Sequence, residues 1–146
     1  MTQGHLVASL FAAYFFGFGL FLPFFPVVLR DSGLSPGEIG TLLSLPMLVR
    51  LAANPLVGAL ADRFATPRVA VSVLSALSAA LFLAFFLASA FWAYAVLLVA
   101  VALVWSPLIP IEDAVAARLD REGKGQYGRM RLWGSISFIA ANLVGG

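Results

Sequence analysis

The chain of 146 residues is strongly apolar: 62% of its residues are hydrophobic, 11% are charged, and the mean hydropathy is +0.99. These values exclude an ordinary soluble domain and indicate a membrane protein. The net charge of +2 is too small to predict binding to nucleic acid, and a sequence without cysteine excludes disulfides and thiolate chemistry.

Five apolar segments predict an all-α integral membrane protein. The expected membrane-spanning helices cover residues 6–29, 39–61, 69–88, 91–111 and 132–146. The first segment lacks the basic start and the cleavage site of a signal peptide, so we expect it to be retained. The stretch 69–111 has no charged residue and is too long for one span. We therefore predict a break at Ser89–Tyr94, with Trp92 and Tyr94 at the level of the lipid headgroups.

Capping and charge patterns indicate one helix start and the orientation of the chain. Ser35, Pro36 and Glu38 form the pattern of a capping box, so the second helix should begin close to Pro36. Most basic residues fall in or beside the second and fourth connections between spans: Arg63, Arg68, Arg118, Arg121, Lys124, Arg129 and Arg131. The positive-inside rule therefore predicts that these connections and the N-terminus face the cytoplasm.

Arg50 lies within the second expected span. About 18 Å of helix separates it from Asp62 at the end of that segment, which places it near the middle of the bilayer. A charge at that depth usually faces a cavity or a partner. We interpret Arg50 as a group that holds an anionic substrate; the alternative is an ion pair with a carboxylate outside this chain.

Arg129 and Arg131 stand at the start of the fifth segment, in the stretch YGRMRLWGS. A cation just inside a span needs water, a carboxylate or an anionic ligand, because a bare cation in hydrocarbon costs several kcal/mol. The two arginines point to different sides of a helix. We assign Arg129 to lipid phosphates or the cytoplasmic loop. For Arg131 the residues alone leave ligand binding and interfacial snorkelling both open.

The stretch GALADRFATPR follows the second segment, and its aspartate can pair with an arginine across a bundle as a charge latch. A basic loop that only sets topology is the alternative. GALADR resembles the cytoplasmic signature of the major facilitator superfamily: Gly58, Leu60, Asp62 and Arg63 match it, but its second glycine is missing. The resemblance implies that Gly58, Asp62, Arg63 and Arg68 form a conformational latch.

A second resemblance covers nearly the whole chain. LPFFPVVLRDSGLSPGEIG and NPLVGALADR resemble the first two helices of the lactose-permease group, which includes phenylpropionate-permease-like transporters, and YGRMRLWGS is similar to the start of its fifth helix. This resemblance implies that Arg131 binds substrate and pairs with Asp113. Phe138 takes the place of a tryptophan that stacks on sugar in that group. A phenylalanine there favours an aryl ring in the substrate, and plain packing is the alternative.

Glu112 precedes Asp113 and cannot share its helix face. We expect one of these two carboxyls to face solvent or the headgroups. Burial of the other would favour its protonated form, which a proton-coupled carrier needs. In the lactose-permease group, however, the coupling residues lie largely in the C-terminal half.

The resemblance implies a major facilitator-type helical bundle. Residues 1–146 would form its N-terminal transmembrane half-domain, helices one to five with the fifth truncated. The implied activity is secondary active transport of a small organic solute, such as an aromatic acid, a sugar or a nucleoside, by alternating access and with protons. The implied partners are the substrate, protons, the lipid bilayer and the missing C-terminal transmembrane half, but no nucleic acid. The implied location is the bacterial inner membrane, with the N-terminus in the cytoplasm.

Two other classes remain as alternatives: a membrane-embedded enzyme and a non-transporting membrane scaffold. The sequence contains no phosphate-binding glycine loop, no paired-histidine metal motif and no nucleophile elbow. We therefore predict no catalytic residues, no metal and no cofactor, and the enzyme is the weaker alternative.

Overall fold

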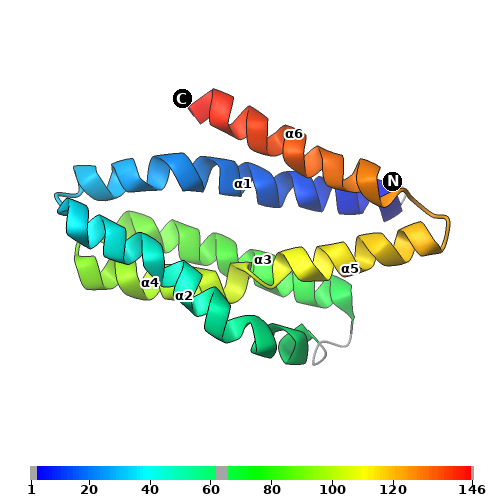
Figure 1. Cartoon of the computed structure of the whole chain (residues 1–146), viewed down its shortest axis with the longest axis horizontal. Coiled ribbons are helices and arrows are strands. Elements are labelled where there is room, and N and C mark those ends of the chain that lie inside the picture. The colour runs from blue at the N-terminus through cyan, green and yellow to red at the C-terminus, as the bar shows by residue number, and fades with distance from the viewer. Residues whose placement is uncertain (1–2, 62–65, 146) are drawn as a thin grey trace. The chain divides into compact units, whose positions relative to one another are not determined.

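The computed structural model describes residues 3–61 and 66–145, with side chains described outside residues 52–61. In this part of the chain it contains six α-helices and one short 3-10 helix (Figure 1). The α-helices are α1 Gln3–Asp31, α2 Pro36–Ala61, α3 Pro67–Ala84, α4 Phe91–Trp105, α5 Leu108–Arg121 and α6 Tyr127–Gly145. The 3-10 helix, η1, covers Phe85–Leu87. The expected all-α class is confirmed.

Three segments of the described chain are long and apolar enough to cross a membrane: Gln3–Asp31, Pro67–Leu87 and Phe91–Arg121. The other two expected spans stay predictions. The chain divides into two compact units. The first unit consists of Met1–Val28 with Glu112–Gly146 and combines most of α1 with α5 and α6. The second unit, Leu29–Ile111, contains α2, α3, η1 and α4.

The start of α2 is set by the predicted capping box. The Ser35 backbone N–H donates to Glu38 Oε2 at 2.8 Å, and the Glu38 N–H donates to Ser35 Oγ at 3.4 Å. The helix begins at Pro36, as expected. At the start of α3, Thr66 Oγ1 accepts a hydrogen bond from the Val69 N–H at 3.4 Å. These side chains satisfy N–H groups that a helix start leaves without intrahelical partners.

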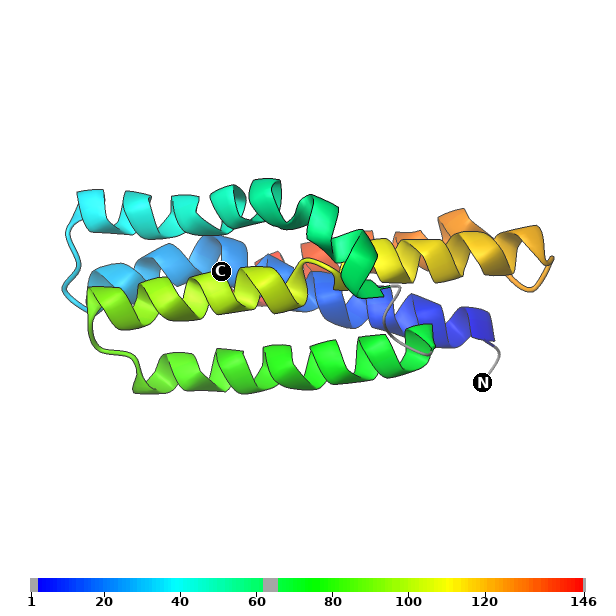
Figure 2. The same ribbon diagram turned by 90° about the horizontal axis from the view of Figure 1, so that it is seen from below.

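The uncharged stretch 69–111 breaks where the sequence predicted. The helical path through α3 and η1 ends at Leu87, and α4 starts at Phe91. α3 and α4 pack side by side, and α4 also packs against α2 (Figure 2). A short reversal of the chain therefore places two apolar helices against each other.

The two aromatic residues at this break differ in their surroundings. Trp92 is 76% exposed, which is compatible with a ring at headgroup level. Tyr94 is buried, its hydroxyl donates to the Ala88 carbonyl at 3.0 Å, and a 2.9 Å hydrogen bond joins it to Ser32 Oγ. The hydroxyl of Tyr94 therefore finds its partners inside the second unit, and its position at headgroup level stays a prediction.

The helix expected to end at Ile111 is longer and interrupted. α5 follows α4 after a short turn and continues to Arg121. The turn contains Pro107, which has no N–H to donate to the preceding helical turn, so the hydrogen-bond ladder stops there. As a result, Glu112 and Asp113 lie in the second turn of a regular helix.

In the first unit, α1 and α6 lie side by side (Figure 1), and their backbones approach closely at Gly19. A Cβ at Gly19 would lie 2.8 Å from the Phe138 carbonyl oxygen and 2.9 Å from the Ala141 Cβ. A backbone oxygen cannot swing aside as a flexible side chain can. The contact therefore requires glycine, as close helix pairs in membranes often do.

We expect Gly19→Ala to push α1 and α6 apart. Overpacking of this kind costs about 1–3 kcal/mol, so the melting temperature of the chain in lipid nanodiscs should fall. Gly128→Ala is the matched control, because Gly128 also lies in a helix of the first unit and a Cβ there would meet nothing within 4 Å. Equal melting of the two variants would contradict the close contact.

Candidate functional site

The predicted pair of Arg131 and Asp113 is brought together in the first unit. Asp113 lies on α5 and Arg131 on α6. Arg131 Nε is 3.8 Å from Asp113 Oδ1, and both side chains are about one-third exposed, at 33% and 34%. The distance is that of an ion pair but exceeds a hydrogen bond. Arg131 and Asp113 therefore form an ion pair without a direct hydrogen bond between these two atoms.

Tyr127 is a third member of this cluster that the sequence analysis missed. Its hydroxyl donates a 3.0 Å hydrogen bond to the same atom, Asp113 Oδ1. That hydrogen bond is the main cause that raises the pKa of the Tyr127 phenol, which precedes the expected span 132–146. The available signal was spacing: Tyr127 stands four residues before Arg131, and residues four apart share a helix face.

Aromatic rings of α1 hold the other side of Arg131. Its guanidinium lies over the Phe15 ring at 4.2 Å from the centroid and over the Phe11 ring at 5.2 Å. Gly134 leaves room for this arrangement, because a Cβ there would lie 2.7 Å from Phe15 Cδ2. The faces of aromatic rings attract cations, so α1 stabilises the charge without contributing a carboxylate.

Phe138 lies two helical turns after Arg131, on the same face of α6. Its ring pairs with Phe18 of α1, with centroids 6.1 Å apart and planes tilted by 33°. Phe18 in turn stacks with Tyr14 at 6.5 Å. An aromatic row therefore extends from the Arg131 cluster along α1 and α6, and the described contacts of Phe138 are packing contacts.

Of the two adjacent carboxyls, Glu112 is the buried one. Its residue is 3% exposed, and its Oε2 has no hydrogen-bond partner among the described residues. Asp113 is instead partly exposed and contacts Tyr127 and Arg131. The two carboxyls thus differ in environment, because adjacent residues of a helix face different sides. Glu112, the more buried one, lacks an ion-pair partner in the described part of the chain.

Arg50 belongs to the second unit. Its Nε donates to Ser106 Oγ at 3.0 Å. Within the described residues it forms no ion pair with a carboxylate. Its substrate role therefore stays a prediction, as does the alternative of a carboxylate outside this chain.

The predicted latch cannot be built from the described residues. Asp62 and Arg63 lie outside them, and of Gly58 the structure describes only its place in α2. Arg68 is exposed in the first turn of α3. The latch stays a prediction.

The connection between α5 and α6 is held by Glu122. Lys124 Nζ donates to Glu122 Oε2 at 2.7 Å, and Arg118 Nε donates to Glu122 Oε1 at 2.8 Å. These two hydrogen bonds, that of Lys124 first, lower the pKa of the Glu122 carboxyl to about 2. Gly123 has a φ of 68°, which favours glycine. A short, internally bonded turn therefore joins the helix of Asp113 to the helix of Arg131.

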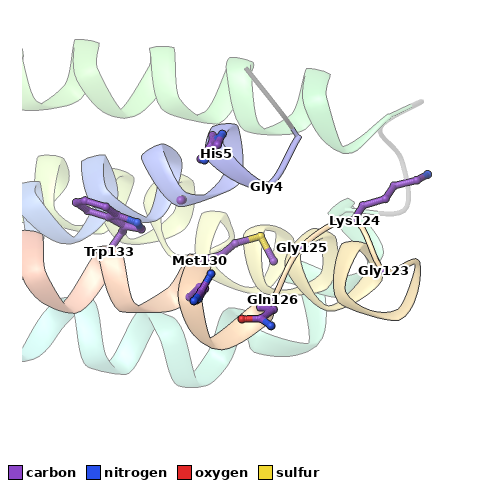
Figure 3. A pocket seen from close by; sticks show the side chains of 10 residues that line it. Gly4, His5, Gly123, Lys124, Gly125, Gln126, Met130 and Trp133 are labelled. Atoms are coloured by element: carbon purple, nitrogen blue, oxygen red, sulfur yellow. The ribbon is translucent and has the colours of Figure 1, made fainter.

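A cavity of about 550 Å³ lies beside this turn (Figure 3). His5 of α1, Lys124 of the turn, and Met130 and Trp133 of α6 are among its lining residues. Neither Arg131 nor Asp113 lines it, and no carboxylate does. Across the described part of the chain, no group of three His, Asp or Glu side chains could hold a metal ion.

Comparison with known proteins places these features in a family. The chain matches the MFS_1 like family over residues 7–146. It is 35% identical over 139 residues to the probable 3-phenylpropionic acid transporter of Escherichia coli (strain K12). The aligned region covers 91% of this chain and 35% of the relative. It is 38% identical over 134 residues to the maltose permease of Geobacillus stearothermophilus, covering 90% and 34%.

A putative nucleoside transporter of Escherichia coli (strain K12) is 29% identical over 147 residues, covering 99% of this chain and 34% of the relative. No solved structure is significantly similar to the chain. The chain spans about a third of the length of these curated relatives. The family match includes the whole cluster of Phe11, Phe15, Asp113, Tyr127 and Arg131. The chain therefore belongs to the MFS_1-like family, a family of integral membrane proteins in the major facilitator superfamily.

Proposed function

We propose that this chain is the N-terminal part of a secondary active transporter, and that Arg131 and Asp113 bind its substrate. The observation that carries the proposal is the open ion pair between two helices, with Arg131 Nε 3.8 Å from Asp113 Oδ1 and both side chains partly exposed. A partly exposed, partly satisfied charge pair offers donors and an acceptor to a polar solute. Polar groups of this kind within a membrane bundle usually serve a transport pathway.

The proposed substrate is a small organic solute such as an aromatic acid, a sugar or a nucleoside. The curated relatives support this range, because their names refer to 3-phenylpropionic acid, maltose and a nucleoside. Within the range we favour an aromatic acid. Arg131 offers N–H donors to a carboxylate, and Phe15, Phe18 and Phe138 offer ring faces and edges nearby.

The proposed mechanism is alternating access. Residues 1–146 would supply five spans of the N-terminal half, with the N-terminus in the cytoplasm of a bacterial cell and the protein in the inner membrane. A C-terminal half would close the cavity from the other side, and the rocking of the two halves would expose the site to each face in turn. Arg50 would hold an anionic substrate, and Gly58, Asp62, Arg63 and Arg68 would act as the cytoplasmic latch.

We also propose that transport is coupled to protons, and that Glu112 takes part. Its carboxyl is buried and its Oε2 lacks a hydrogen-bond partner in the described residues. Keeping a carboxylate charged in such a place is costly, whereas the neutral acid is tolerated. Glu112 is also the immediate neighbour of Asp113. A change in the charge of Glu112 would therefore alter the electrostatic interaction between Asp113 and Arg131.

Arg131→Ala and Asp113→Ala in the complete carrier should each weaken binding of 3-phenylpropionate at least tenfold while membrane insertion is unchanged. Loss of a hydrogen bond to a charged group, worth about 1.5–3 kcal/mol, is the physical reason. Equilibrium binding in membrane vesicles measures the effect, with maltose and a nucleoside as further probes. The matched controls are Arg129→Ala and Asp120→Ala, both at exposed positions on the same helices. Unchanged binding in the Arg131 variant would rule out the proposed substrate site.

Glu112→Gln should abolish accumulation of solute driven by a proton gradient while exchange of solute across the membrane without a gradient continues. Glutamine keeps the shape of the side chain but cannot release a proton. Uptake and exchange are measured in the same proteoliposomes, and Asp120→Asn, an exposed carboxylate on α5, is the control. Accumulation by the Glu112 variant at the level of the unsubstituted carrier would exclude this residue from coupling.

A further inference from the structure

One carboxylate oxygen in the first unit serves two neighbours. Asp113 Oδ1 accepts the Tyr127 hydroxyl at 3.0 Å, and the same atom is the one nearest to Arg131 Nε, at 3.8 Å. A hydrogen bond is formed to the phenol and not to the guanidinium, since 3.8 Å lies beyond hydrogen-bond distance. The carboxylate is therefore oriented by the uncharged partner, while the charged partner is held at a distance.

Arg131 does not depend on the carboxylate alone. Its guanidinium rests over Phe15 at 4.2 Å and over Phe11 at 5.2 Å, and α1 carries no charged residue between Leu6 and Leu29. The rings stabilise the cation through their faces, and its Nε, 3.8 Å from Asp113 Oδ1, forms no direct hydrogen bond with that carboxylate. The N–H edges of the guanidinium are the groups that would bind a carboxylate or another acceptor on a ligand in two-pronged geometry.

We propose that Tyr127 is a positioning residue of the substrate site, which keeps Asp113 from closing onto Arg131 and so leaves the guanidinium available to an acceptor group of the substrate. This inference rests on the proposed function. It also deepens that function, because a guanidinium kept open beside aromatic rings selects a solute that carries a carboxylate or an equivalent acceptor. Without the phenol, Asp113 Oδ1 would lack its hydrogen-bond donor, and the nearest replacement is the Arg131 N–H.

Tyr127→Phe tests this inference directly, because it removes only the hydroxyl. In the chain labelled with 15N-arginine in lipid nanodiscs, the Arg131 Nε–H resonance is assigned by its loss in Arg131→Lys. Tyr127→Phe should move that resonance downfield as the N–H begins to donate to Asp113. Adding Asp113→Asn to Tyr127→Phe should reverse most of the shift, whereas adding Asp120→Asn should not. A Tyr127 that only packs would leave the resonance in place, which would overturn the proposal.

The second measurement is affinity in the complete carrier. Tyr127→Phe should weaken binding of 3-phenylpropionate about tenfold, and Trp133→Phe, an exposed ring on α6, should leave it unchanged. A shifted Arg131 resonance with unchanged affinity would overturn the positioning role. If the unsubstituted carrier binds neither 3-phenylpropionate nor maltose, the proposed function fails, and the resonance measurement still decides whether Tyr127 holds the ion pair open.

Discussion

The described site depends on one constraint: the charge of a guanidinium within an apolar bundle must be stabilised. In this site that happens without a direct hydrogen bond to the carboxylate. Arg131 meets this constraint with three kinds of partner. A carboxylate lies at ion-pair distance, two aromatic rings lie beneath the cation, and a phenol occupies the carboxylate oxygen. These groups come from α5, α1 and α6 respectively, so the cluster joins all three helices of the first unit. The tight turn at Glu122 and the close approach at Gly19 hold those segments in place.

Local features of the fold were predictable from the sequence. The capping box of Ser35 and Glu38 and the break before Phe91 rest on neighbouring residues, so no knowledge of packing was needed. The hydrogen bonds of the Tyr94 hydroxyl to Ser32 and the Ala88 carbonyl were not predictable, because these groups become neighbours only after folding. The extension of α5 was missed because charged residues were taken to mark a loop, whereas a helix accommodates them where one face reaches water.

The site shows the same division. The pairing of Arg131 with Asp113 was expected from a family resemblance, and the geometry agrees with it. The contact of Arg131 with the Phe11 and Phe15 rings could not be predicted. Nothing in YGRMRLWGS identifies which rings of α1 lie beneath the arginine. The contrast between Glu112 and Asp113 was predictable only in outline. Helix geometry requires the two carboxyls to face different ways, but the choice of the buried one depends on tertiary packing.

Gly134 has a consequence that reaches beyond packing. Its missing Cβ leaves the space that the Phe15 ring occupies beneath Arg131. Any larger residue there would displace the Phe15 ring, and the Arg131 cation would lose part of its contact with the ring face. No charged or polar group would have been changed. An apparently silent change in volume would thus become an electrostatic defect. Natural variation at this position would therefore change how strongly the Phe15 ring stabilises Arg131.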